Sequence, residues 1–190
     1  MSRQNAAGSS VTDIIGCKPA VSLDGGTPRV WKFPELGTET FKTGCAVSLS
    51  GVAGAQTGLT TATTDASGYG IVGFAAQNSQ AATSAMTGVW IATPDIIFLG
   101  NVTHTTSASA ITAATDIGQL YGLTTLSGVT SVDKAKTNAS TSMCRVVGLH
   151  GGDTLGTYNG KVYFKVASRH CQLDNNMLIG LSGGSTAMVV

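Results

Sequence analysis

His150 and Asp153 form the one place in this sequence where only two residues separate an imidazole from a carboxylate. A turn at this His-Gly-Gly-Asp segment would bring the two groups together, as general acid–base catalysis requires. A tetrapeptide of this kind is common by chance, however, and no Gly-x-Ser-x-Gly elbow or Gly-Lys-Ser/Thr phosphate loop accompanies it. We therefore predict that the chain is not an enzyme and has no catalytic residue.

The remaining histidines and the cysteines lack the spacing of metal ligands. His104 and His170 complete the set of histidines, and no Cys-x-x-Cys or His-x-x-x-His pair occurs. His170 and Cys171 are adjacent, and adjacent residues of a strand point to opposite faces, so one ion would not meet both. The ten acidic residues are spread singly along the chain, which does not indicate a pair of catalytic carboxylates. We predict no metal site and no cofactor.

The cysteines are expected to be buried thiols rather than disulfides. The first five residues, Met1 to Asn5, are polar and lack the apolar segment of a secretory signal, so we expect the protein to be made and used in the cytoplasm. In a reducing compartment, isolated cysteines behave as small hydrophobic residues. The four are Cys17, Cys45, Cys144 and Cys171.

Short β-branched runs bounded by Gly, Pro and Asp recur along the chain and predict strands. Asp24-Gly25-Gly26 predicts a tight turn, with 29–33 returning as the second strand of a hairpin. In 161–166, Val162, Phe164 and Val166 alternate with polar residues, a pattern typical of a sheet with one solvated face. The predicted strands are 19–23, 29–33, 45–49, 69–75, 89–92, 96–102, 145–149 and 161–166.

Helix signals are weak, and only 109–122 competes for a short helix, with Gly118 and Gly122 opposing it. The Gly/Ala/Thr stretch 51–67 has no periodicity, so we expect a long functional or partner-facing loop. Many short strands with almost no helix predict an all-β fold, a single small β-barrel or sandwich-like domain. We place this domain at residues 18–171, between an N-terminal arm (1–17) and a C-terminal arm (172–190) that docks on a neighbour or is disordered.

Composition narrows the range of partners. Charged residues make up 11% of the chain, against about 25% in an average soluble protein. Lys134 and Lys136 are the closest basic pairing and the net charge is +1, so nucleic-acid binding is not indicated. Apolar runs such as Ile96–Leu99 are far shorter than the roughly 18 residues of a membrane-spanning helix, which indicates no membrane insertion. A surface rich in hydroxyls either tolerates burial against other proteins or reflects a β-rich chain with short side chains.

A succession of segments carries a family resemblance: 41–49, 69–75, 86–94, 96–102, 116–123, 132–133 and 145–149. Together they form a pattern of short strands and glycines, and a Gly/Thr-rich loop follows the first segment. This succession resembles the small virion proteins of tailed bacteriophages that decorate or cement the capsid, over roughly residues 40–168.

The resemblance implies a β-barrel-like domain bound to the outside of the capsid, with arms reaching over neighbouring subunits. Its partners would be the major capsid protein and further copies of itself, as a homotrimer. Its location would be the capsid surface of the virion, after assembly in the host cytoplasm.

Two alternatives stay open. One is another virion component, such as a head fibre, a coat protein or a tail protein. The other is a carbohydrate-binding adhesin module, which would require Trp31 or Trp90 to be accessible to solvent. We expect both tryptophans to anchor the core, because a buried aromatic ring contributes a large apolar area.

Overall fold

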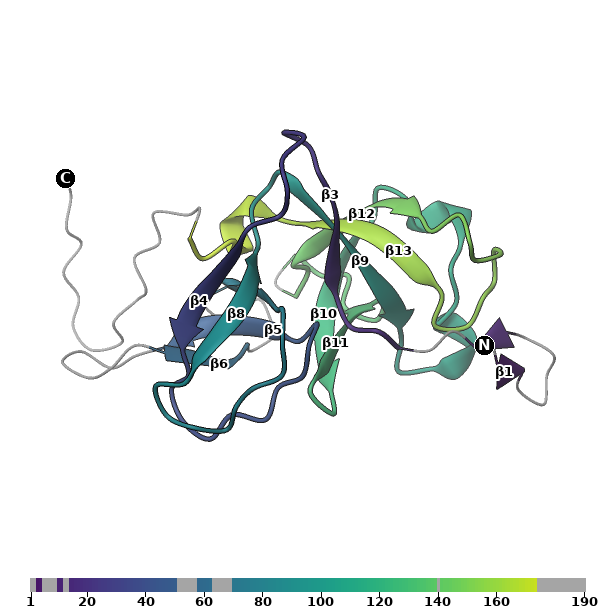
Figure 1. Ribbon diagram of the computed structural model, residues 1–190. Coiled ribbons are helices and arrows are strands. Elements are labelled where there is room, and N and C mark those ends of the chain that lie inside the picture. The colour runs from purple at the N-terminus through teal and green to yellow at the C-terminus, as the bar shows by residue number, and fades with distance from the viewer. Residues whose placement is uncertain are drawn as a thin grey trace.

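The fold is all-β, as predicted, and consists of two sheets packed against each other (Figure 1). The computed structural model describes residues 14–50, 58–62, 70–139 and 141–173, together with the backbone of 3–4 and 10–11. The last two segments are strands β1 (Arg3–Gln4) and β2 (Ser10–Val11), which pair antiparallel. The helices of the described residues are single 3-10 turns: η1 (Ser107–Ser109), η2 (Ala114–Asp116) and η3 (Ser168–His170).

The larger sheet closes into a barrel. Its strand order is β11-β10-β12-β13-β9-β3, and β11 also pairs parallel with β9 at Val132 and Val102, which completes a ring. Strand β3 lies outside this ring, along the first half of β9. Closure removes the unpaired edges that an open sheet would present. The strands are β3 (Lys18–Ser22), β9 (Ile96–Thr103), β10 (Leu120–Leu126), β11 (Val129–Asp133), β12 (Cys144–Leu149) and β13 (Lys161–Val166).

The smaller sheet has the order β4-β8-β7-β5-β6, and all of its strand pairs are antiparallel. A single bridge between Glu35 and Leu59 joins the end of β4 to β6. Along the rest of its length, β4 pairs with β8 alone among the described strands. The strands are β4 (Val30–Pro34), β5 (Ala46–Ser50), β6 (Gly58–Thr61), β7 (Gly73–Ala75) and β8 (Met86–Ile91).

A shared core holds the two sheets together. Phe74 on β7 packs against Phe98 on β9 with ring centroids 4.7 Å apart, and Phe164 on β13 lies 5.9 Å from each. The opposite face of the smaller sheet covers a second cluster that includes Phe41, Val47, Leu59, Val72 and Val89. Strands β5 and β7 of the smaller sheet therefore contribute buried side chains to both clusters, whereas the edge strand β4 is largely exposed.

Two glycines form a close backbone contact where the chain enters β3 and β5. Gly16 and Gly44 both have positive φ, +71° and +84°. The backbone N–H of Cys17 donates to the carbonyl of Gly44 at 3.0 Å, and Gly44 N–H donates to Ala75 at 2.8 Å. Because only glycine adopts this conformation at low cost, and a Cβ would not fit, both positions require it.

The hairpin predicted for 19–33 is wrong. Strand β3 pairs with β9 in the larger sheet, and β4 pairs with β8 in the smaller one. The predicted turn exists, with Gly25 at φ +76° and its N–H donating to the carbonyl of Ser22. After this turn the chain crosses to the other sheet instead of returning along β3. Local turn chemistry identified the bend and left the partner strand undetermined.

The segment 109–122 contains the single turn η2 and then enters β10 at Leu120, so no longer helix forms there. Strands β10 and β11 make a hairpin through Ser127 and Gly128, both with positive φ, as a tight hairpin turn requires. Strand β6 occupies part of the predicted loop 51–67, and 51–57 and 63–67 lie outside the described residues.

All four cysteines are buried and free, as predicted. The packed body extends past both predicted boundaries, since Cys17 is completely buried and the Gln172 side chain makes two hydrogen bonds with the backbone of Leu49. Most of the two predicted arms lies outside the described residues.

Candidate interaction surface

The structure brings His150 and Asp153 near each other, but the Asp153 carboxylate mainly contacts Lys161. Nδ1 of His150 lies 3.6 Å from Oδ2 of Asp153. The same Oδ2 accepts a hydrogen bond from the backbone N–H of Lys161 at 2.7 Å, and the Lys161 ammonium lies 3.7 Å from Oδ1. Asp153 thus fastens the loop after β12 to the start of β13.

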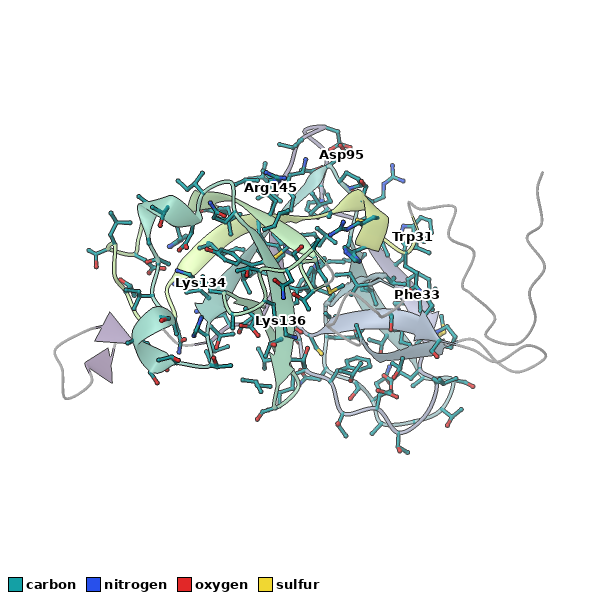
Figure 2. All side chains as sticks on the ribbon, turned by 180° about the vertical axis from the view of Figure 1, so that it is seen from behind. Trp31, Phe33, Asp95, Lys134, Lys136 and Arg145 are labelled. Atoms are coloured by element: carbon teal, nitrogen blue, oxygen red, sulfur yellow. The ribbon has the colours of Figure 1, made fainter. Side chains whose placement is uncertain are left out.

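Lys134 and Lys136 do not form a basic surface. The ammonium of Lys134 lies 2.8 Å from Oδ1 of Asp116, which is only 2% exposed and also accepts a hydrogen bond from the hydroxyl of Tyr121 at 2.8 Å. Burial and this carboxylate raise the pKa of Tyr121, so its hydroxyl remains a donor. Lys136 donates to the carbonyl of Leu123 at 2.9 Å. Figure 2 shows both lysines on the barrel, Lys134 farther than Lys136 from Trp31 and Phe33 on the smaller sheet.

His170 is buried where η3 meets the smaller sheet. Its Nε2 accepts a hydrogen bond from Nε of Arg169 at 3.0 Å, and its carbonyl accepts one from Ile71 N–H at 2.8 Å. The guanidinium of Arg169 donates to the carbonyls of Ala139 and Ser142. Burial and, secondly, the charge of Arg169 lower the pKa of His170.

This histidine makes stability depend on pH. In the unfolded chain, His170 binds a proton below its ordinary pKa of 6.5, whereas in the folded chain it stays neutral to a lower pH. The free energy of unfolding therefore falls as the pH drops through 6.5. We expect His170→Gln to flatten that dependence, measured by urea unfolding between about pH 8 and pH 5.5. His104→Gln, at a position near η1, is the matched control. An unchanged slope in His170→Gln would contradict the assignment.

Trp31 is not a core residue, which corrects the prediction made for it. Its side chain is 50% exposed, although Phe33, on the same face of β4, packs against the smaller core. Trp31 lies on the edge strand β4, opposite the buried Val89 of β8. Trp90 follows the prediction, because it is partly buried and packs against the shared core.

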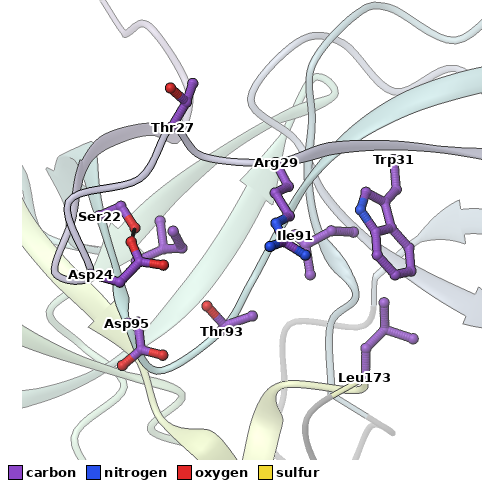
Figure 3. A pocket seen from close by; sticks show the side chains of 10 residues that line it. Ser22, Asp24, Thr27, Arg29, Trp31, Ile91, Thr93, Asp95 and Leu173 are labelled. Carbon is purple, nitrogen blue, oxygen red and sulfur yellow. Dashed lines mark hydrogen bonds between the residues drawn. The ribbon is translucent and has the colours of Figure 1, made fainter.

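Trp31 borders a pocket of about 460 Å³ between the β3–β4 connection and the turn from β8 to β9 (Figure 3). The backbone N–H of Leu23 donates to the carbonyl of Asp95 at 2.9 Å, which ties these two loops together. The pocket is partly open to solvent and combines apolar and polar side chains. It is lined by Ser22, Asp24, Thr27, Arg29, Trp31, Ile91, Thr93, Asp95, Ile96 and Leu173.

The polar side chains of this pocket are largely available to a ligand. Oδ1 of Asp24 accepts hydrogen bonds from the Ser22 hydroxyl and from Gly26 N–H, which lower the pKa of Asp24 and keep it ionised. Among the described residues, none forms a side-chain hydrogen bond or ion pair with Arg29 or with the carboxylate of Asp95.

A second surface lies on the outer face of the β4–β8 pair. Val30 and Pro34 share this face with their cross-strand neighbours Trp90 and Met86. Val30 and Met86 are 50% and 47% exposed, and between them the exposed Lys32 lies opposite the buried Gly88. We call Val30, Lys32, Pro34, Met86 and Gly88 the β4–β8 outer face, in which Lys32 is the one charged member. It lies next to the edge of β4 that pairs with no described strand from Val30 to Phe33.

Within the described part of the chain, no three His, Cys, Asp or Glu side chains are grouped to hold a metal ion. No helix there has the length and apolar character needed to cross a bilayer.

Comparison with known proteins assigns no family to this chain. No protein-family model matches it, and neither do the curated proteins or the solved structures.

Proposed function

We propose that this protein is a structural component of a tailed-bacteriophage virion, which binds the outer surface of the capsid and cements neighbouring subunits. The β4–β8 outer face is the observation that carries the proposal. Val30 and Met86 keep about half of their surface in water and lie on the same face of two paired strands, β4 and β8. An exposed apolar patch beside an open strand edge is typical of a surface that another protein covers.

The architecture suits this role. The shared core makes the two sheets one body, so a force applied at the smaller sheet is transmitted to the barrel. With few charged residues, little ionic desolvation opposes docking. The open edge of β4 offers backbone donors and acceptors to an extended segment of a capsid subunit.

A cementing protein acts through linkage. Any molecule that binds only the assembled, expanded lattice stabilises that lattice by mass action. Many copies on one particle multiply a modest contact, because each copy bridges subunits that are already held together.

Cosedimentation with expanded capsids tests the proposal. We expect the wild-type protein to bind and Val30→Glu to bind at least about tenfold more weakly, because desolvating a carboxylate in the interface costs more than the ~1.4 kcal/mol that equals a factor of ten. Leu155→Glu is the matched control, since Leu155 is 64% exposed on the loop between β12 and β13.

Failure of the wild-type protein to bind mature capsids would overturn the proposal, and so would equal loss in the two variants. The number of copies per virion separates a decoration protein, present in many copies, from a head fibre or tail component. Light scattering after size exclusion tests the expected homotrimer.

A further inference from the structure

The pocket at Trp31 has an apolar wall on one side and polar side chains on the other, as the binding of a sugar ring requires. One wall is apolar, formed by the half-exposed indole of Trp31 and by Leu173, with the buried Ile91 and Ile96 also in the lining. Figure 3 shows Asp24 and Asp95 on the opposite side of the pocket, with Arg29 between the two groups. A pyranose has an apolar face of C–H groups that packs on an indole ring and a rim of hydroxyls that needs polar partners.

The charges of the pocket discriminate between classes of ligand. Two carboxylates, Asp24 and Asp95, and one guanidinium, Arg29, line the same space. A carboxylate only accepts hydrogen bonds and a guanidinium only donates them. An anionic ligand would satisfy Arg29 but face two negative groups, and a cationic ligand would meet the reverse conflict at Arg29. A neutral hydroxyl both donates and accepts, so vicinal hydroxyls satisfy both kinds of side chain at once.

We propose that this pocket binds a neutral saccharide, with one pyranose ring packed on Trp31 and its hydroxyls hydrogen-bonded to Arg29, Asp24 and Asp95. The volume of about 460 Å³ lies within the roughly 300–1,000 Å³ of ligand pockets. This binding function is additional to capsid attachment. Trp31 and Val30 are adjacent on β4 and therefore point to opposite faces, so the pocket and the β4–β8 outer face are separate surfaces.

The pocket is organised before a ligand arrives. The Ser22 hydroxyl and Gly26 N–H hold the carboxylate of Asp24, and the hydrogen bond from Leu23 to Asp95 fixes the two loops against each other. Groups already held in place lose less conformational entropy on binding, which favours affinity.

Saturation-transfer NMR with neutral sugars tests the proposal on the full-length protein. The probes are the methyl glycosides of glucose, galactose and mannose, N-acetylglucosamine, and the disaccharides lactose and maltose. We expect at least one to bind with a dissociation constant of about 1 mM or below, and to change Trp fluorescence. Trp31→Ala should weaken that binding by about tenfold or more, whereas Trp31→Phe, which keeps an aromatic surface, should retain much of it.

Leu155→Ala, outside the pocket, is the control, and far-UV circular dichroism checks the fold of each variant. Absence of binding by every neutral sugar in the panel overturns the proposal, as does binding that survives Trp31→Ala. Preferential binding of sialyllactose or of oligolysine would also overturn it, because the charge argument excludes both. Asp95→Ala changes the pocket away from β4, so its capsid cosedimentation should equal that of the wild type, and each proposal can fail without the other.

Discussion

Gly44→Ala is expected to lower the free energy of unfolding by about 3 kcal/mol or more, enough to leave much of the chain unfolded if overall stability is ordinary. Gly44 has φ +84°, a conformation that costs a residue with a Cβ about 1–3 kcal/mol. A Cβ here would also lie 2.8 Å from the backbone nitrogen of Cys17 and 2.8 Å from Cα of Gly16. Both neighbours are backbone atoms, so neither can move aside as a flexible side chain would.

Gly25→Ala separates the two causes. Gly25 has a similar φ, +76°, but a Cβ there would meet no atom within 4 Å. We expect this variant to lose only the conformational cost, about 1 kcal/mol. Urea unfolding monitored by Trp fluorescence measures both. Equal losses in Gly25→Ala and Gly44→Ala would show that the close contact between the entries to β3 and β5 contributes nothing.

Phe98→Ala is expected to lower the free energy of unfolding by about 3–5 kcal/mol, as for other large-to-small changes of fully buried aromatic residues. Phe98 is fully buried, and its ring packs against Phe74 of the smaller sheet and Phe164 of the barrel. Because the three rings come from both sheets, the truncation removes contacts within the barrel and across the interface together.

Phe33→Ala is the comparison, since Phe33 is only partly buried against the smaller core and its loss should cost about 1–2 kcal/mol. A double-mutant cycle of Phe74→Ala and Phe98→Ala should show a coupling of about 0.5–1.5 kcal/mol. If the sheets form one unit, unfolding by fluorescence and by circular dichroism should coincide in one transition. Two separate transitions would contradict the shared core.

Strands with a clear alternation could be predicted from the sequence, and their partners could not. In β13, Val162, Phe164 and Val166 point into the core as the period of two requires. The turn at Gly25 was equally visible, but pairing depends on which distant strand covers the next apolar face. That choice is made by tertiary packing, which placed β3 beside β9.

The short hairpin of β10 and β11 was missed, and with it the buried pair of Asp116 and Lys134. The Thr-rich run in β10 has no strong hydrophobic period, and the signal that could have found it is the Ser127-Gly128 turn. This hairpin brings Lys134 back beside the residues that precede β10. A pair 18 positions apart in sequence becomes a contact only once that turn is recognised.

The exposure of Trp31 could not be predicted from β4 alone. Val30 and Pro34 alternate with Trp31 and Phe33, so both faces of this strand carry apolar side chains. Periodicity therefore identified a strand without deciding which face would be covered. The place of β4 at the edge of the smaller sheet leaves Trp31 half exposed, and that place is set by strand pairings with residues far away in the chain.

Because β9 pairs with three strands, it constrains the order in which the molecule folds. Strand β9 pairs with β11, about 30 residues later in the chain at Val102, and with β13, which follows later still. Its first half pairs with β3, which lies near the beginning of the chain. On the ribosome, β9 must therefore wait for the last of these segments to emerge before its ladders are complete. Topologies with such distant pairings form slowly, over milliseconds to seconds, and leave apolar strands open to aggregation meanwhile. This architecture is therefore most vulnerable to aggregation during synthesis, when chaperones are needed, rather than to loss of stability once it has folded.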